Sequence, residues 1–432
     1  MSLELHPRCK ERLVESIAGQ LLNINVKNKM FIERSSCIGL FDIENILPRD
    51  MGNLSSYIGE HPLVDFIYET LSRELGEKFG YDSDIPLCKL TEIEEYTETN
   101  QLATRLVEQF DSLPWQYTFT IELGADLSKI FHESIGEFKL SERILIRKFD
   151  DEFSESFPTM SGLEKRDSDL CENNLLFSLP RNWNQDAAFL QVNSLGFVGR
   201  YGVGEVLKEV EEMLKSFCGL GLALRLFKID SKYRSTPTKS KFYSHQRQDD
   251  SWVAFGKHEL DYNESDTFHD LVLHDLNGQL DDYEKLSNWV NLRMNDIKVT
   301  FSSQNKDITN KLLLACQWLF ESCSVKNELL SFVQTTVVIE ILLGDKALSE
   351  QIGLGTLLRN RCAYLIGTSQ TQRDEILADF QEIYDVRSKI VHAGKSRLSS
   401  KEMSLLHKLQ WMCRRVIQEE VKLLSNEEVG KV

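Results

Sequence analysis

Apolar residues recur every three or four positions along the last third of the chain. Beyond residue 305 this period predicts only helices, joined by connections short enough for a bundle. Five helices are expected, over residues 310–323, 328–343, 356–366, 371–392 and 401–424. The last begins with Ser399-x-x-Glu402, in which the serine hydroxyl and the glutamate carboxylate can each satisfy a free backbone N–H group.

The first 300 residues carry a mixed pattern. Helical spacing covers residues 11–22, 62–79 and 205–217, whereas short β-branched or aromatic runs at 116–123, 143–147, 188–192 and 222–229 predict strands. Two polar stretches without a period, 149–174 and 231–250, are expected to be a long loop and an exposed excursion. The predicted fold class is therefore α+β multidomain: a mixed α/β region over 1–300, with a candidate subdomain break near 150–175, followed by an all-α bundle over 305–425.

The net charge of −17 is concentrated in the mixed region. Residues 301–432 contain 17 Lys and Arg against 16 Asp and Glu, so the first 300 residues hold 33 against 51. A strongly acidic body repels nucleic acid phosphates, and a near-neutral bundle does not. We expect any nucleic acid chemistry to belong to the bundle and the acidic region to meet a protein.

The compartment is suggested by the cysteines and by the absence of long apolar segments. Nine cysteines are scattered without a C-x-x-C pair, and the Met1 end lacks the apolar core of a signal peptide. The most apolar run, Val337 to Leu343, is broken by Glu340 and is far shorter than the roughly 20 residues that cross a bilayer. These features predict a soluble cytoplasmic protein with no membrane partner. Separately, no metal and no cofactor are expected.

An arginine and a histidine near the end of the fourth predicted helix are the candidate catalytic residues. Arg387 and His392 are five positions apart, and Ala393-Gly394 supplies the glycine expected just after a helix. A histidine at a helix C-terminus suits a proton shuttle, while arginine can hold a phosphate and offset its charge. On an ideal helix the two are separated by about 7.5 Å and about 140°, so two copies of the helix facing each other across a two-fold axis would complete one cleft.

By spacing alone, a structural interpretation of this pair is the commoner one. Arg387 could pair with Asp385 or Glu382, and His392 could merely cap helix carbonyls. Glu340 interrupts an apolar helix and must find a partner, because burying an unpaired acid is costly. It could form a structural ion pair with Arg359 or Arg361, or lie at the catalytic cleft and orient Arg387.

The wider sequence around this pair carries a family resemblance. The segment Tyr384-Asp-Val-Arg-Ser-Lys-Ile-Val-His-Ala-Gly394 closely resembles the signature of HEPN domains, small helical bundles with an Arg-x4-6-His motif. It is most similar to the ApeA-like group, and the resemblance covers roughly residues 305–425. It implies a homodimeric, metal-independent ribonuclease of the bacterial anti-phage, abortive-infection type, with Arg387 and His392 catalytic and Ser388 as the polar neighbour of the arginine. Many active members carry Asn or Asp where this chain has Ser388.

Other motifs are weaker. Residues 199–204 resemble a phosphate-cradling loop but lack the Walker lysine and the Rossmann spacing, so a turn is expected. His269 and His274 lie among acidic residues, and a solvated face is favoured there over a metal site.

Two candidate functions, which belong to different functional classes, are therefore expected. The first is an RNA-cleaving effector whose N-terminal region either senses a protein trigger, such as a phage component, or restrains the bundle. The alternative is an inactive HEPN scaffold that only dimerises or binds.

Overall fold

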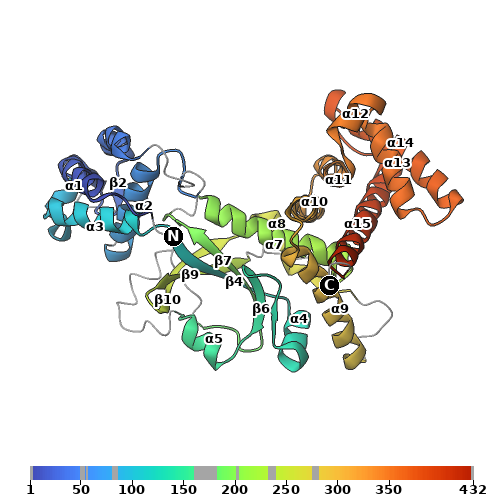
Figure 1. Ribbon diagram of the computed structural model, residues 1–432, viewed down its shortest axis with the longest axis horizontal. Coiled ribbons are helices and arrows are strands. Elements are labelled where there is room, and N and C mark those ends of the chain that lie inside the picture. The colour runs from blue at the N-terminus through green and yellow to red at the C-terminus, as the bar shows by residue number, and fades with distance from the viewer. Residues whose placement is uncertain are drawn as a thin grey trace.

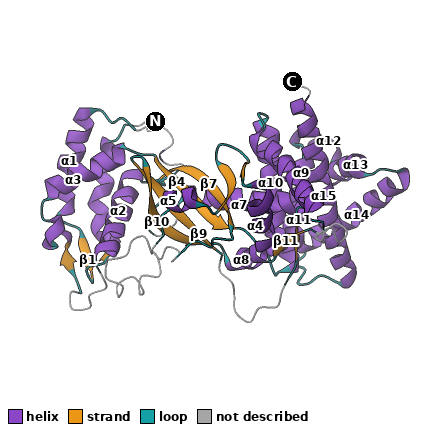
Figure 2. Cartoon of the chain, turned by 90° about the horizontal axis from the view of Figure 1, so that it is seen from below, coloured by secondary structure: helices purple, strands orange, loops and turns teal. Residues whose placement is uncertain are grey.

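The computed structural model describes residues 3–48, 54, 57–79, 86–159, 182–200, 204–231, 240–274 and 282–429. Three parts follow one another along the longest axis of the molecule: N-terminal helices, a central antiparallel sheet and a C-terminal helical bundle (Figure 1). Figure 2 shows the sheet between the two helical parts. The mixed α/β N-terminal region and the helical C-terminal region predicted from the sequence are confirmed.

The N-terminal part is built around its own hydrophobic cluster, which includes the buried side chains of Leu13, Phe66 and Phe110. Phe197 from the central sheet also joins this cluster. The helices predicted over residues 11–22 and 62–79 are confirmed as α1 and α2. The elements of this part are α1 (Pro7–Leu21), β1 (Asn25–Lys27), β2 (Phe31–Ile32), η1 (Arg34–Ile46), α2 (Pro62–Lys78), β3 (Cys88–Lys89), η3 (Leu90–Glu92), η4 (Glu94–Tyr96) and α3 (Thr99–Asp111).

The central sheet has six strands in the order β10-β9-β4-β7-β6-β5, and all neighbouring strands are antiparallel. A separate two-stranded sheet pairs β8 with β11. The strands of this part are β4 (Trp115–Glu122), β5 (Glu137–Lys139), β6 (Ile144–Lys148), β7 (Ala188–Gly196), β8 (Phe227–Ile229), β9 (Lys241–Gln248), β10 (Ser251–Glu259) and β11 (Leu271–Leu273). The helices are α4 (Ala125–Ile130), η5 (Phe131–Ile135), α5 (Asp151–Ser156), α7 (Glu205–Ala223), α8 (Tyr262–His269) and α9 (Tyr283–Ser302).

The two faces of the sheet are covered differently. Helix α7 packs its apolar stripe, including Val210 and Leu214, against one face. On the other face Phe153 of α5 stacks on Phe189 of β7 with ring centroids 4.7 Å apart, and Trp183 closes over both rings. Because both faces are covered, even polar strand residues of this sheet become buried.

Several predictions for this region were wrong. The segment predicted as an exposed excursion contains β9, which lies between β4 and β10 and buries Ser244, His245 and Gln246. The sequence pattern did not predict β9 because the strand is rich in polar residues. In the fold these polar side chains are buried by the aromatic residues that cover the sheet. The strand predicted over 222–229 is only Phe227–Ile229, since α7 continues to Ala223, and the predicted loop at 149–174 contains α5.

The predicted subdomain break near 150–175 overlaps residues 160–181, which lie outside the described part of the chain. Strands β6 and β7, on the two sides of this segment, pair directly with each other. The described chain instead passes from the N-terminal cluster into the next one between Leu113 and Tyr117.

The C-terminal bundle contains no strand among its described residues, 306–429, and its five predicted helices are confirmed. A further short helix, α12, was not predicted, and it buries none of its side chains. Arg387 and His392 therefore lie on the fifth helix of the bundle, one later than predicted. The helices are α10 (Lys306–Ser324), α11 (Glu328–Leu343), α12 (Lys346–Ile352), α13 (Leu354–Ile366), α14 (Gln370–His392) and α15 (Ser400–Val429).

The sheet and the bundle share one continuous hydrophobic core, which crosses the short connection at Ser303 to Asn305 between α9 and α10. Helix α7 belongs to the central part, yet it packs closely on α10. A Cβ atom placed on Gly219 would lie 1.9 Å from the carbonyl oxygen of Cys316. Glycine at this position therefore sets how closely the two backbones approach.

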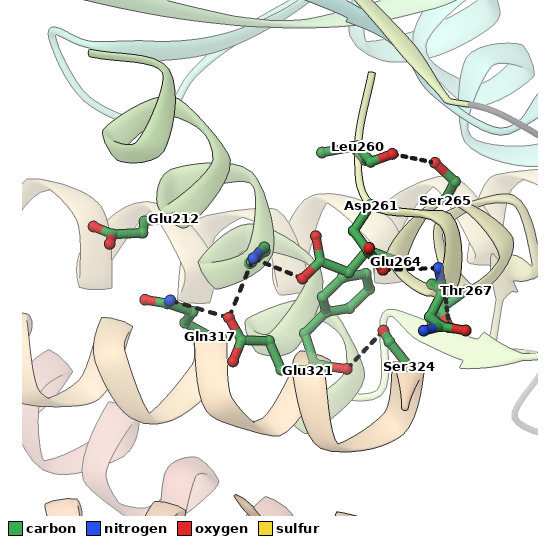
Figure 3. Close-up of polar contacts among 12 residues, drawn as sticks. Glu212, Leu260, Asp261, Glu264, Ser265, Thr267, Gln317, Glu321 and Ser324 are labelled. Atoms are coloured by element: carbon green, nitrogen blue, oxygen red, sulfur yellow. Dashed lines mark hydrogen bonds and ion pairs between the residues drawn. The ribbon is translucent and has the colours of Figure 1, made fainter. Parts of the chain in front are cut away.

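A lysine whose side chain is only 13% exposed reinforces the same junction. Lys215 of α7 binds Glu264 of α8 at 2.7 Å and Glu321 of α10 at 3.2 Å. Figure 3 shows Glu264 and Glu321 approaching from their two elements, with Gln317 beside Glu321. Burial would lower the pKa of Lys215, but the hydrogen bonds and charges of the two glutamates outweigh it and raise that pKa. The lysine thus stays charged and joins three helices.

The predicted capping box at the start of α15 is also confirmed. The backbone N–H of Ser399 donates to Glu402 Oε2 at 2.8 Å, and the N–H of Glu402 points back to Ser399 Oγ at 3.4 Å. Lys395 pairs with the other carboxylate oxygen at 3.0 Å. The pKa of Glu402 is lowered to about 2, chiefly by the Ser399 N–H and further by Lys395.

Gly219→Ala is expected to destabilise the protein by about 1–3 kcal/mol, because the added methyl group forces α7 away from α10. The measurement is the Tm and the free energy of unfolding in urea. Gly19→Ala is the matched control, since a Cβ there meets nothing within 4 Å and α1 gains a better helix former. Equal loss of stability in both variants would contradict the close α7–α10 contact.

Glu402→Gln is expected to cost about 1 kcal/mol at neutral pH, the usual loss for a helix cap. The folded-state pKa of Glu402 lies below its ordinary value of 4.5, so its carboxylate stabilises the fold above that pH. This contribution is lost as the pH falls from 4.5 towards about 2, and the difference between wild type and variant should shrink over that range.

The test of the capping prediction is urea unfolding of both proteins at several pH values. Glu382→Gln serves as the control, because the Glu382–Lys401 pair is exposed and should contribute less than about 0.5 kcal/mol. A stability difference for Glu402→Gln that stays constant down to pH 3 would rule out this carboxylate as the source.

Candidate active site

The arginine of the motif lies at the edge of the buried stripe of α14. Ile376, Phe380, Ile383 and Val386 face the bundle core at helical spacing, which is why this segment folds as one long helix. Arg387 follows this stripe directly and keeps 26% of its side chain exposed. The guanidinium therefore lies where the bundle surface meets solvent.

His392 is the last residue of α14 and is exposed. The chain turns away just after it, because Gly394 adopts the left-handed conformation with φ +64°. The N–H of Lys395 then reaches back to the carbonyl of Lys389 at 3.3 Å. The His392 side chain has no hydrogen-bond partner among the described residues, so it can meet a substrate directly.

Glu340 of α11 contacts Arg387. Its Oε1 atom lies 3.3 Å from Arg387 Nε, at ion-pair distance but without good hydrogen-bond geometry. The terminal guanidinium nitrogens of Arg387 make no hydrogen bond to a described residue. The ion pair thus holds the guanidinium at Nε and leaves its two terminal nitrogens available for an anion.

Tyr384 completes this contact. Its hydroxyl donates to Glu340 Oε1 at 3.0 Å, and its ring stacks on Phe380 with centroids 5.8 Å apart. The guanidinium carbon of Arg387 lies 6.0 Å from the Tyr384 ring centroid. Burial raises the pKa of Tyr384, and the negative charge of Glu340 raises it further, so the tyrosine remains a proton donor to the glutamate.

The alternative partners considered from the sequence are engaged elsewhere. Arg361 donates to the carbonyl of Leu343 at 2.8 Å, and Arg359 donates to Gln381 at 3.1 Å. Glu382 pairs with Lys401 at 2.7 Å, and Asp385 accepts a hydrogen bond from Gln381. Of the two positions weighed for Glu340, the contact with Arg387 is the one that the structure contains.

The structure does not bring all the predicted site residues together. Arg387 and Glu340 are in contact, whereas the Ser388 side chain is exposed. Within one chain, Arg387 and His392 remain about 7.5 Å apart along the helix axis and about 140° apart around it. One copy therefore offers an arginine and a histidine that face different directions.

Tyr384 was missed as a site residue. It belongs to the motif segment, and its position three residues before Arg387 places both on one side of the helix. That spacing could have suggested a shared partner. Identifying the partner as Glu340, 44 residues earlier, requires the fold.

The described residues do not support a chemical role for the weaker motifs. Residues 201–203 of the glycine-containing segment lie outside the described part, and the neighbouring Arg200 is buried, donating to the carbonyls of Met30 and Ser72. Among the described residues, which exclude 275–281, no group of three or more His, Cys, Asp or Glu could hold a metal ion. Nor does any helix in the described ranges combine the length and the apolar character needed to cross a bilayer.

Comparisons with models of known families, with curated proteins and with solved structures each find no match to this chain. The candidate site therefore rests on its own residues: Arg387 held by Glu340, the tyrosine that supports the glutamate, and the exposed His392.

Proposed function

We propose that the protein is a metal-independent endoribonuclease of the HEPN type, in which two copies of the bundle form one cleft. The observation that supports this most is the Glu340–Arg387–Tyr384 arrangement. An arginine held at Nε by a carboxylate has its outer nitrogens oriented and ready for a phosphate. An arginine with a merely structural role would be expected to direct those nitrogens at protein acceptors.

The proposed reaction needs one base, one acid and one phosphate-binding group. His392 of one copy takes the proton from a ribose 2′-hydroxyl, and the 2′-oxygen attacks phosphorus. The bond from phosphorus to the 5′-oxygen breaks, and the partner's His392 gives a proton to that oxygen. The products are a 2′,3′-cyclic phosphate and a 5′-hydroxyl end, and Arg387 stabilises the charge that develops on the phosphate.

Two copies are proposed because Arg387 and His392 of one copy face different directions and cannot act on the same phosphate. We propose that the copies pair through an apolar patch formed by the exposed side chains of Leu348, Ile352, Leu354 and Val391. A Cβ on Gly355 would lie 3.2 Å from the Tyr384 ring, so α13 starts next to the motif and α12 precedes it there. A short helix with every side chain at least partly exposed is best explained by a partner that covers it.

The acidic N-terminal region is proposed to control the bundle and to meet a protein trigger. Its negative charge disfavours direct RNA binding at long range. The eight cysteines of the described part are free, which fits a reducing cytoplasm, and a role in anti-phage defence follows from the family resemblance. The alternative function is an inactive HEPN scaffold, in which Arg387 and His392 would be replaceable.

The purified full chain is expected to cleave total RNA or tRNA in EDTA, and His392→Ala should reduce the rate by about 100-fold or more because a proton-transfer group is lost. Arg387→Ala should reduce it by a similar factor, since a phosphate-binding charge is removed. The measurement is the rate of cleavage together with the chemistry of the product ends. A substrate with 2′-deoxyribose at the cleavage position should resist.

His407→Ala is the matched control, because His407 is an exposed histidine on the neighbouring helix α15. It should cleave at the wild-type rate. If the wild type does not cleave RNA under any of these conditions, or if His392→Ala cleaves as fast as the wild type, the scaffold function is correct and the enzyme is not.

Ile352→Asp is expected to weaken the proposed dimer at least tenfold, because it places a charge in an apolar interface. Sedimentation equilibrium gives the dimer dissociation constant, and the cleavage rate per chain should fall in parallel at low protein concentration. Since Ile352 is 51% exposed, the fold of each protomer should be unaffected.

Leu423→Asp provides a control of equal exposure on α15, away from the patch. It should leave both the dimer and cleavage unchanged. A wild-type protein that remains monomeric at tens of micromolar while cleaving RNA would contradict the two-copy site.

A further inference from the structure

A strongly basic cavity lies where the middle of α15 meets the end of α7 and the small sheet of β8 and β11. Its volume is about 450 Å³, within the range of small-molecule sites. The described lining residues include no Asp or Glu. They are Leu222, Arg225, Phe227, Lys228, Ile229, His274, Trp411, Arg414, Arg415 and Gln418.

Most cations of this cavity have no acidic partner among the described residues. Arg415 is held by Glu419 at 3.0 Å, but Arg225, Lys228 and Arg414 form no ion pair with any described residue. Burial lowers the pKa of His274, and the charges of Arg225, Lys228 and Arg414 lower it further, so these groups lie close enough to act on one imidazole. In a protein with net charge −17, such a concentration of unpaired positive charge requires an explanation.

Two buried polar atoms in the cavity have no partner. Neither the Nε of Arg414 nor the Nδ1 of His274 has a hydrogen-bond partner among the described residues. Buried donors and acceptors are normally satisfied, because an unsatisfied one costs about 1–3 kcal/mol. An anionic ligand in this cavity would supply the missing acceptor for the arginine.

The backbone at the cavity mouth is strained. Arg225 directly follows the C-cap residue of α7 and adopts φ +61°, a left-handed conformation that usually selects glycine or asparagine. An arginine is disfavoured there, because its side chain crowds the left-handed backbone. Strain of this kind is retained mainly where the side chain has a function.

An aromatic surface completes the cavity. Trp411 is 37% exposed and lies one helical turn before Arg414 and Arg415, on the same side of α15. Gln418 follows on that side and donates to the carbonyl of Ala223 at 2.6 Å, which joins α15 to the end of α7. Unpaired cations next to an exposed indole match a ligand with a phosphate and a flat base.

We propose that this cavity binds a free nucleotide, with its phosphate between Arg225, Lys228 and Arg414 and its base against Trp411. A single cavity of this volume fits one nucleotide better than a strand, which needs an extended basic groove. The acidic body of the protein also repels a long polyanion more than a small one. The inference is independent of the proposed ribonuclease, because it concerns other residues and is tested by binding alone.

The experiment is calorimetric titration of the full chain with ATP, AMP, adenosine, pyrophosphate and a ten-nucleotide RNA, without divalent cations. ATP and AMP should bind, and adenosine should bind at least about tenfold more weakly, since charged hydrogen bonds to the phosphate are lost. Lys228→Gln and Arg414→Gln should each weaken ATP binding about tenfold. Trp411→Leu should weaken ATP binding at least about fivefold through lost stacking, while pyrophosphate binding stays within about twofold.

Arg225→Gly separates binding from folding. It relieves the left-handed strain, so its Tm should equal or exceed that of the wild type while ATP binding weakens. Lys422→Gln, which removes an exposed charge from the same helix outside the cavity, should bind ATP like the wild type. The proposal is overturned if no nucleotide binds at 1 mM, if adenosine binds as well as AMP, or if Arg225→Gly and Trp411→Leu bind ATP normally. Binding of the RNA alone, abolished by the same substitutions, would instead assign the cavity to a substrate strand.

Discussion

The close packing of α7 on α10 is the contact on which the rest of the structure depends. Gly219 lets the two backbones meet, and Lys215 holds α8 and α10 to the same helix through the largely buried glutamates Glu264 and Glu321. Since one hydrophobic core runs from the sheet into the bundle, the bundle is not a free-standing module. A fragment cut near residue 300 would lose α7 and α9 and expose apolar surface, so the site must be studied in the full chain.

Within the bundle, one polar contact serves both folding and the proposed chemistry. Glu340 interrupts an apolar helix, and its carboxylate would be costly at 21% exposure without partners. Arg387 and Tyr384 of α14 supply those partners, which ties α14 to α11. The same interaction orients the guanidinium, so the free energy that stabilises the bundle also prepares the arginine for a phosphate.

Local signals in the sequence predicted most of the helical architecture. The apolar period gave the bundle helices to within a few residues, and Ser399 with Glu402 marked the start of α15 correctly. The failures arise where burial depends on distant segments: β9 looks like a polar loop because its cover comes from α5 and Trp183. Likewise, the motif pointed to Arg387 and His392, but only the fold pairs Arg387 with Glu340 and gathers Arg225, His274 and Arg414 into one cavity.

Helix α15 runs between the two proposed sites. Its first turn is capped by the loop that follows His392, and its middle lines the basic cavity, about 18 Å further along the axis from Glu402 to Arg414. Buried side chains along α15, among them Leu409, Cys413 and Val416, pack it into the bundle core between these two points. If both proposals hold, a ligand that drew Arg414 towards Arg225 would act on the same helix whose first turn is tied to the loop after His392.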